Sequence, residues 1–405
     1  MEQYRHSRSM SLKHRPTNPN LAEPATARGG IRFDRNELAG AFGDIGTDLP
    51  LIVGVILAAH LDSASALILF GAMQILTALR YRMPMPVQPL KAVAALVIAQ
   101  KISGNVLFGG GLAIGILMLF LTITGLIDLL ARVVPKAVVR GIQFGLGLQL
   151  ATLALKEYVG ADGGRGYVLA AIAFVLTLIL IGNRRYPAAL FVIALGLAYA
   201  IVFKLNGPML LEGIGFRLPH VYRPTTQDVW LGFVLLALPQ IPLSLGNSVL
   251  ATRQITEDLF PERPVTVRGI GFTYSLMNLI NPFFGGIPTC HGSGGMMGHY
   301  AFGGRTGGSV ILYGLLYLIL GLFFSGSFAH VVQVFPLPIL GVLLLIEGLR
   351  IMLLIRDTVE VKAEFSIAVL VGLIAAGLPY GYLVGIVIGT ILFYVTRKRP
   401  FSHEL

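Results

Sequence analysis

The chain has little cysteine and little charge. Cys290 is the only cysteine among 405 residues, which excludes an intramolecular disulfide and a cysteine-rich metal centre. Charged residues make up 13% of the sequence, whereas a soluble domain carries about 25%. Hydrophobic residues make up 55%, and the mean hydropathy is +0.76. This composition predicts a polytopic protein embedded in a lipid bilayer.

Positive charge exceeds negative charge, and the net charge is +11. In a soluble protein this excess would suggest a nucleic-acid partner. Here most lysines and arginines lie in the tails and in short loops between apolar segments, so we expect no nucleic-acid partner. With an even number of crossings, most of these cations fall on one side together with both termini. The positive-inside rule makes that side the cytoplasmic face of a cell membrane.

Apolar stretches of about 20 residues, long enough to cross a bilayer, recur from Leu38 to Thr396. They predict fourteen spans in two sets of seven. The first set is Leu38–His60, Ala64–Leu79, Pro86–Gln100, Leu107–Ala131, Pro135–Leu155, Gly166–Gly182 and Pro187–Leu205. The second set is Asp228–Thr252, Gly269–Phe284, Thr289–Gly303, Gly307–Phe328, Pro336–Leu354, Ala363–Leu378 and Tyr380–Thr396.

The two sets define the expected domains. Residues 1–30 are polar and basic and lack the apolar region of a signal peptide, which predicts a disordered cytoplasmic tail. Residues 31–206 hold the first seven spans, 207–227 form a polar linker, and 228–396 hold the second seven. Residues 397–405 are expected to form a short cytoplasmic tail.

Proline recurs at matching places in the two halves. The pairs lie at similar separations and are Pro50 with Pro242, Pro86 with Pro288, and Pro135 with Pro336. This spacing indicates a duplication. Seven spans is an odd number, so the second copy must run upside down relative to the first. The third and tenth spans are short and interrupted, which in two inverted halves is typical of the binding site of a transporter.

The tenth span opens with irregular backbone. Seven of the sixteen residues of Gly285-Gly-Ile-Pro-Thr-Cys-His-Gly-Ser-Gly-Gly-Met-Met-Gly-His-Tyr300 are Gly or Pro. At membrane depth such backbone is tolerated only where it is buried in protein or lines a wet cavity. A helix that restarts there would point unpaired N–H groups and a partial positive charge at the space before it, which is an anion site. The alternative is a glycine-rich loop between two helices.

Polar residues surround the expected starts of the two half-helices. Hydroxyl and backbone donors at such positions suit a tetrahedral oxyanion, and a histidine there could also titrate. The predicted substrate contacts are Gln88, Thr289, Cys290, His291, Gly292 and Ser293.

A polar stripe in the eighth span consists of Gln240, Ser244 and Asn247 at roughly helical spacing. Such a stripe either hydrogen-bonds neighbouring helices or lines a site. Because it flanks Pro242 in the repeated segment, we favour site lining.

Ionisable residues inside spans cost about 2.5–3.5 kcal/mol each and are therefore functional candidates. Asp44 and Asp48 lie four residues apart, on one helix face, where two carboxylates repel each other and suit a proton-carrying pair. The alternative is local capping, or pairing with Arg140 or Lys91. Lys91 would supply a cation to an anionic substrate, or pair with one of the aspartates. Glu347, Asp128 and Arg140 are expected to form structural or gating pairs.

Other chemistries fit the residue spacing poorly. Cys290, His291 and His299 are badly spaced as metal ligands, and Cys290 and His291, as sequence neighbours, would point apart as a nucleophile pair. We therefore expect no metal, no cofactor and no enzymatic activity, with an intramembrane hydrolase as a less favoured alternative. The glycines of Gly145–Gly147 follow no strand, so they predict helix packing and not a nucleotide-binding loop.

Five stretches resemble the molybdate transporter family within the sulfate permease superfamily. They are Gly43-Asp-Ile-Gly-Thr-Asp-Leu-Pro50, Pro84-Met-Pro-Val-Gln-Pro89, Leu238-Pro-Gln-Ile-Pro-Leu-Ser-Leu-Gly-Asn-Ser248, Pro288-Thr-Cys-His-Gly-Ser-Gly-Gly295 and His299-Tyr-Ala-Phe-Gly-Gly-Arg-Thr-Gly307. The likeness spans nearly the whole chain after the N-terminal tail, and the last two stretches are specific. Unlike typical sulfate permeases, this sequence has no regulatory domain after the last span.

The resemblance implies an all-α membrane protein with a seven-plus-seven inverted repeat, divided into a core domain and a gate domain. Substrate would lie between the third and tenth half-helices, lined by the first span, which contains Thr47, and by the eighth. The resemblance also allows a homodimer.

The function that it implies is secondary active import of molybdate by alternating access, with sulfate or another oxyanion as the alternative substrate. Entry of a dianion against an inside-negative potential costs about 2.3 kcal/mol per charge per 100 mV, so protons are the expected coupling ion. A nucleobase permease would share the architecture but needs a carboxylate in the eighth span, and none lies between Leu231 and Thr252. An anion channel is a further alternative.

Overall fold

The computed structural model describes residues 30–180, 188–204 and 207–398. The predicted tails, 1–30 and 397–405, lie almost entirely outside these ranges. The first half contains α2 (Arg35–Ala41), α3 (Ile45–Ala59), α4 (Ser63–Tyr81), β1 (Val87–Pro89), α5 (Lys91–Gln100), α6 (Gly104–Thr124), α7 (Leu126–Val133), α8 (Lys136–Leu153), η1 (Ala154–Tyr158), α9 (Gly163–Leu180), α10 (Ala188–Phe203) and α11 (Gly207–Glu212). The second half contains α12 (Thr226–Gly232), η2 (Phe233–Ala237), α13 (Leu238–Leu243), η3 (Ser244–Ala251), α14 (Thr252–Leu259), α15 (Val267–Ile280), η4 (Asn281–Phe284), β2 (Thr289–His291), α16 (Ser293–Ala301), α17 (Gly308–Val334), α18 (Leu337–Met352), η5 (Leu353–Thr358), α19 (Lys362–Gly377) and α20 (Gly381–Lys398).

The helices have the length and apolarity of membrane spans. Among the described residues, seven helical runs are long and apolar enough to cross a bilayer: α4, α6, α8 with η1, α9, α12 through α14, α17, and α18 with η5. The bent pair α2 and α3, at 41° to each other, would make an eighth span. The all-α membrane class is therefore confirmed. Each of the fourteen predicted intervals contains helix, but several of these helices are short or interrupted.

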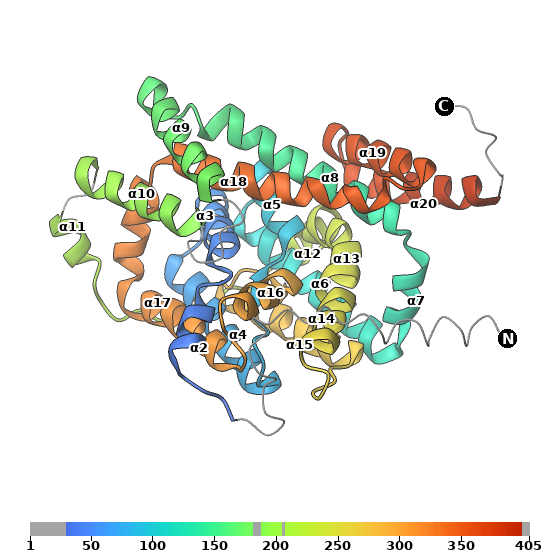
Figure 1. Ribbon diagram of the computed structural model, residues 1–405, viewed down its shortest axis with the longest axis horizontal. Helices are drawn as coiled ribbons and strands as arrows, with labels where there is room; N and C mark the ends of the chain where they lie inside the picture. The colour runs from blue at the N-terminus through green and yellow to red at the C-terminus, as the bar shows by residue number, and fades with distance from the viewer. Residues whose placement is uncertain (1–29, 181–187, 205–206, 399–405) are drawn as a thin grey trace.

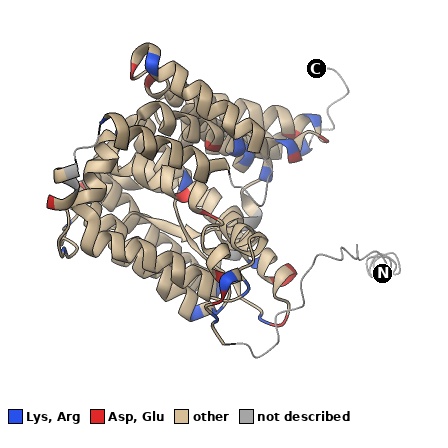
Figure 2. Cartoon of the chain, turned by 60° about the vertical axis from the view of Figure 1, so that its left-hand side comes forward, with Lys and Arg blue, Asp and Glu red and all other residues tan. Residues whose placement is uncertain are grey.

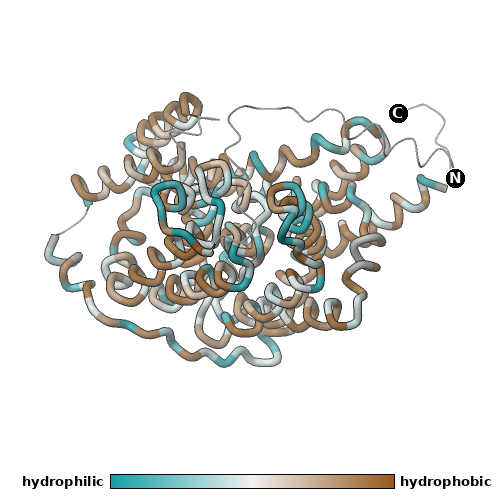
Figure 3. The backbone as a smooth tube through the Cα atoms, turned by 60° about the horizontal axis from the view of Figure 1, so that its bottom comes forward, coloured by the Kyte–Doolittle hydropathy of each residue, from teal (hydrophilic) through white to brown (hydrophobic). Residues whose placement is uncertain are grey.

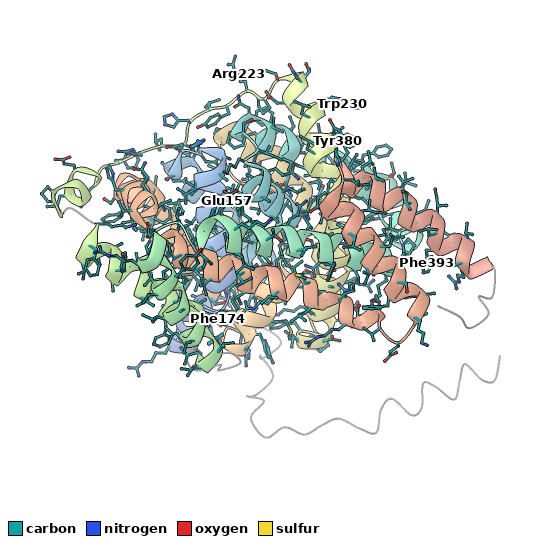
Figure 4. All side chains as sticks on the ribbon, turned by 90° about the horizontal axis from the view of Figure 1, so that it is seen from above. Glu157, Phe174, Arg223, Trp230, Tyr380 and Phe393 are labelled. Carbon is teal, nitrogen blue, oxygen red and sulfur yellow. The ribbon has the colours of Figure 1, made fainter. Side chains whose placement is uncertain are left out.

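Hydropathy follows the same pattern. Most of the helical tube is hydrophobic, and hydrophilic colour gathers in the connections (Figure 3). Lys, Arg, Asp and Glu lie mostly near helix ends (Figure 2). Trp230 and Tyr380 are 65% and 60% exposed, and both lie at the edge of the molecule (Figure 4). Large exposed apolar side chains of this kind suit a surface that faces lipid.

The helices form two groups. The first group consists of α2 to α6 and α12 to α17, and the second of α8 to α10 and α18 to α20. In Figure 1, α8 and α18 run side by side along one edge, while α2, α4 and α14 to α17 lie below them. The groups meet where α5 contacts α8 and where α3 contacts α18.

Small residues bring the helices of the second group into close contact, as predicted for Gly145–Gly147. A Cβ atom on Gly147 would overlap the backbone of Gly348 in α18, and one on Gly145 would meet Gly372 in α19. Glycine permits such backbone approach between membrane helices. The second group is therefore tightly packed along α8.

Proline interrupts the long run from α12 to α14. Pro242 lies inside α13 and Pro239 lies in its first turn, and wide π-helical turns, η2 and η3, flank α13 on both sides. Proline cannot donate the helical hydrogen bond and its ring crowds the preceding turn, so the backbone widens around it. This local irregularity aims polar side chains of η3 toward the middle of the molecule.

Two short strands precede the predicted half-helices. They were not predicted from the sequence. β1 and β2 pair antiparallel with Val87 opposite His291 and Gln88 opposite Cys290, and all six strand residues are buried. The Leu90 N–H donates to the Pro288 carbonyl at 3.0 Å and extends the pairing. The chain thus passes through the protein interior as extended backbone before α5 and α16 begin.

Side-chain amides satisfy the outer edges of this two-stranded sheet. Gln74 of α4 donates to the Val87 carbonyl at 2.6 Å and accepts from the Val87 N–H at 2.8 Å. Asn278 of α15 donates to the Thr289 carbonyl at 2.6 Å and accepts from its N–H at 2.9 Å. The two amides come from the helices that precede each strand, so the same solution appears once in each half of the chain.

We predict that Gln74→Ala and Asn278→Ala destabilise the protein. Each change leaves a buried N–H and a buried carbonyl without partners, at about 1–3 kcal/mol per group. Thermal unfolding of the purified protein in detergent measures the effect. Gln254→Ala is the control, because Gln254 is exposed and, within the described ranges, its side chain bonds Asp258 on its own helix. Equal melting temperatures for all three variants would contradict the role of the two amides.

Candidate anion-binding cavity

A cavity of about 410 Å³ lies between the two groups of helices, at the start of α16. Its polar lining comes from both groups. The first group contributes Asp44, Thr47, Gln88, Lys91, Asn247 and Ser293. The second group contributes Gln143, Glu347 and Arg350. Six of the thirteen predicted site residues therefore meet in one cavity.

The start of α16 is open to this cavity. No side chain caps its first turn, and Gly294 is exposed with nothing within 4 Å of the position that a Cβ would take. The Ser293 hydroxyl donates to Asn247 Oδ1 at 3.1 Å. A helix start with free N–H groups carries partial positive charge, which favours an anion.

The start of α5 is closed. Gln240 Oε1 accepts from the Ala92 N–H at 3.0 Å and from the Val93 N–H at 3.3 Å. The Gln240 amide also donates to Ser244, whose hydroxyl bonds Tyr274 at 2.7 Å. Gln240 and Ser244 lie outside the cavity lining and connect helices, which is the alternative to site lining that the sequence left open.

Asp44 and Gln88 form one unit beside the start of α16. The Gln88 side-chain amide donates to Asp44 Oδ2 at 2.6 Å. The Asp44 carboxylate rests against Gly295, and the Gln88 side chain rests against Gly292, where a Cβ would overlap each of them. Glycine at these two positions lets a carboxylate and an amide approach the helix backbone directly.

Lys91 lies on the boundary between the two groups. Its ammonium is 3.5 Å from Glu347 Oε1 of α18, and Arg350 is 3.9 Å from Glu347 Oε2. The expected pairing of Lys91 with Asp44 or Asp48 is therefore not the ion pair that forms. Arg140, the other expected partner of the aspartates, instead binds Asp357 at 2.6 Å and Gln143 at 2.8 Å.

Asp48 lies behind the cavity and does not line it. It is fully buried, accepts from the Tyr313 hydroxyl at 3.3 Å, and its Oδ1 has no hydrogen-bond partner among the described residues. Tyr313 in turn bonds Tyr317 at 3.0 Å. The two aspartates thus differ in access, because only Asp44 reaches the cavity. The side chain of Asp128 lies outside the part of the chain that is described.

None of the strand residues of the tenth span lines the cavity. Thr289 is held by Asn278 and Asn281, and His291 Nε2 bonds the Thr273 hydroxyl at 2.6 Å. Cys290 is buried between these two residues. Side chains of successive strand residues point to opposite faces, so Cys290 and His291 do not converge. These residues position the start of α16, and Gly292 is its N-cap.

Sequence reasoning did not place Gln143 and Arg350 in the site, and it assigned Glu347 only to a structural or gating pair. Glu347 and Arg350 carry the available signal, since two charges one turn apart interrupt an otherwise apolar span. Gln143 gives no comparable signal, because polar residues at helix–helix contacts are common. Only the packing of the second group against the first brings these three residues to the cavity.

Comparison with known families places the chain among transporters. The sequence profile of a family described as molybdate transporter of MFS superfamily matches residues 36–150 and 232–351. The matches fall one in each half of the chain and include every polar residue that lines the cavity.

Curated relatives match over most of their length. Molybdate transporter 2 of Arabidopsis thaliana is 32% identical over 91% of this chain and 88% of its own length. Molybdate transporter 1 of the same plant is 31% identical over 91% and 89%. Molybdate transporter 1 of Chlamydomonas reinhardtii is 27% identical over 87% and 90%.

Solved structures show the same fold. The transmembrane domain of the cyanobacterial bicarbonate transporter BicA matches with a TM-score of 0.61 at 18% identity, over 86% of this chain and 99% of that one. Murine Slc26a9, an anion transporter in the inward-facing state, matches with a TM-score of 0.67 at 12% identity, over 98% and 75%. At these identities the likeness establishes the fold and leaves the substrate open.

We predict opposite outcomes for two glycines at the start of α16. Gly292→Ala would drive a methyl group into Gln88 and break its bond to Asp44, so it should lower the melting temperature by several degrees. Gly294→Ala meets open space and should leave the melting temperature unchanged. Thermal unfolding of both purified variants makes the comparison, and equal destabilisation would contradict the described packing.

Proposed function

The chain belongs to the molybdate transporter family, and from this we propose that it carries molybdate across a cell membrane as a secondary active transporter. The cavity between the two groups of helices holds the substrate. The observation that carries the proposal is that the open start of α16, with its Ser293 hydroxyl, lines the same cavity as the Lys91 and Arg350 side chains. These are donors and cations suited to a tetrahedral dianion.

The set of substrate-binding residues that we propose is smaller than the set predicted from the sequence. Gln88, Lys91, Asn247, Ser293 and Thr47 line the cavity and bind substrate. Thr289, Cys290, His291 and Gly292 hold the strand and the helix start in place, and Gln240 and Ser244 hold α5. These supporting residues fix the geometry of the site, which a binding pocket needs as much as its direct contacts.

We propose fourteen crossings in an inverted seven-plus-seven repeat, with residues 31–206 as one copy and 228–396 as the other. A helix in each of the fourteen intervals supports this, as do the antiparallel strands and the matched amides Gln74 and Asn278. The first group of helices acts as the core domain and the second as the gate domain. Both termini lie in the cytoplasm, following the distribution of lysine and arginine.

Transport proceeds by alternating access. The core domain moves against the gate domain and exposes the cavity to each side in turn. Import of a dianion against an inside-negative potential costs about 2.3 kcal/mol per charge per 100 mV, so uptake is coupled to protons. Asp44 exchanges its proton with the cavity, and Asp48 holds a second site behind it. Sulfate has the same shape and charge and is the competing substrate.

We predict uphill accumulation of labelled molybdate in proteoliposomes when the pH outside is lower than inside. Sulfate added in excess at two pH values tests the preference for molybdate. Liposomes without protein provide the background. Uptake that only equilibrates with the bath would identify a channel, and no uptake at either pH would refute the proposed substrate.

For the coupling residues, Asp44→Asn and Asp48→Asn should each abolish uptake driven by a pH gradient and spare molybdate–molybdate exchange. Exchange needs no net proton movement, so it separates coupling from binding. Glu257→Gln is the control, because the side chain of Glu257 is 40% exposed and, among the described residues, pairs with Arg253 on its own helix. Undiminished pH-driven uptake in either aspartate variant would remove that residue from the coupling mechanism.

A further inference from the structure

Glu347 has an unusual position for a carboxylate in an anion site. Its side chain is only 5% exposed, it lies in an apolar stretch of α18, and it faces the cavity. It belongs to the second group of helices, whereas its partner Lys91 begins α5 in the first group. The Lys91–Glu347 pair is therefore an ion pair across the surface where the two groups meet.

The charges around the cavity cancel. Lys91 and Arg350 contribute two cations, and Asp44 and Glu347 contribute two carboxylates. Asp44 is held by the Gln88 amide at 2.6 Å, and Glu347 is the carboxylate that forms the ion pair with Lys91, at 3.5 Å. An oxyanion entering the cavity would meet the Glu347 carboxylate, and also that of Asp44 whenever Asp44 has released its proton, and the lysine that could bind it is occupied. Like charges in such a site cost binding energy.

The pair is also loose. Lys91 and Glu347 are 3.5 Å apart, and Arg350 and Glu347 are 3.9 Å apart. Within the second group, by comparison, Arg140 donates three hydrogen bonds of 2.6 to 3.1 Å to the Asp357 carboxylate. A long ion pair without a tight hydrogen bond loses little when another anion replaces one partner. Glu347 can then stay near Arg350, which is one helical turn away.

We propose that Glu347 is an internal stand-in for the substrate: it neutralises Lys91 while the cavity is empty, and the oxyanion displaces it on binding. This inference rests on the proposed function, because it takes a tetrahedral oxyanion as the ligand. Displacement breaks the ion pair that joins the two groups of helices, so binding frees the core to move. Without substrate the pair forms again and holds the core against the gate, so the core moves less readily while the cavity is empty.

We predict that Glu347→Gln strengthens molybdate binding but reduces net uptake. The glutamine keeps the size of the side chain but leaves Lys91 free, so the variant should bind molybdate about tenfold more tightly than the wild type. The core of the variant is no longer held while the cavity is empty, so it can cross with a proton but without molybdate. Molybdate–molybdate exchange should therefore persist while proton-driven net uptake falls about tenfold.

Titration of molybdate into the purified wild type and variant, measured calorimetrically, gives the first readout, and exchange and net uptake in proteoliposomes give the second. Glu157→Gln is the matched control. Glu157 (Figure 4) also pairs a lysine of the first group, Lys101, at 3.0 Å, but its side chain is 50% exposed and lies outside this cavity. The control should match the wild type in both readouts.

The outcomes separate the two proposals. If the wild type binds no molybdate, the proposed function fails. If the wild type binds and a folded Glu347→Gln binds no more tightly, or loses exchange together with net uptake, the displacement inference fails alone. Should this variant not fold, Lys91→Gln/Glu347→Gln removes both charges and carries the test. It should lose molybdate binding, and wild-type affinity in this double variant would overturn the role of Lys91 on which the inference depends.

Discussion

Every backbone polar group that lies at membrane depth needs a partner inside the protein, and this requirement organises the centre of the molecule. The chain crosses the interior as extended backbone at 87–89 and 289–291, where no helix can satisfy it. Strand pairing satisfies the inner edges, and Gln74 and Asn278 satisfy Val87 and Thr289 on the outer edges. Once the two strands are paired and the two amides are in place, α5 and α16 can begin in the middle of the protein.

The two helix starts are chemically different although each follows a buried strand whose edge is bonded by a side-chain amide. Gln240 occupies the first N–H groups of α5, whereas the start of α16 stays open beside Ser293 and Gly294. The two strand-and-helix arrangements are therefore similar in backbone, and single side chains decide which helix start is open. In the proposed site, an oxyanion would meet one open helix start and one lysine, and it would not lie symmetrically between two equal positive ends.

The membrane class could be predicted from the sequence because low charge and high hydropathy are properties of the composition. The interrupted tenth span and the packing role of Gly145–Gly147 could be predicted because glycine and proline act directly on backbone geometry. The sequence also selected Gln88, Lys91 and Ser293, since each stands near the start of a predicted half-helix, and Asn247, since it belongs to the polar stripe of the eighth span. It could not tell that Thr289 and His291 do not line the cavity. Their orientation depends on the strand pairing. The three residues between Pro288 and Gly292 are too few to show the alternation of polar and apolar residues by which a strand is recognised. The contributions of Gln143 and Arg350 depend on how two groups of helices dock, which no local pattern encodes.

The pairing of β1 with β2 also has a consequence for energetics across the bilayer. Because the strands and their amide partners belong to one group of helices, the proposed mechanism would move the open start of α16, Ser293 and the ammonium of Lys91 as one rigid unit. Their intrinsic attraction for an oxyanion is then the same on either face of the membrane. Any difference between capture on one face and release on the other must come from α8 and α18, the helices that stay behind.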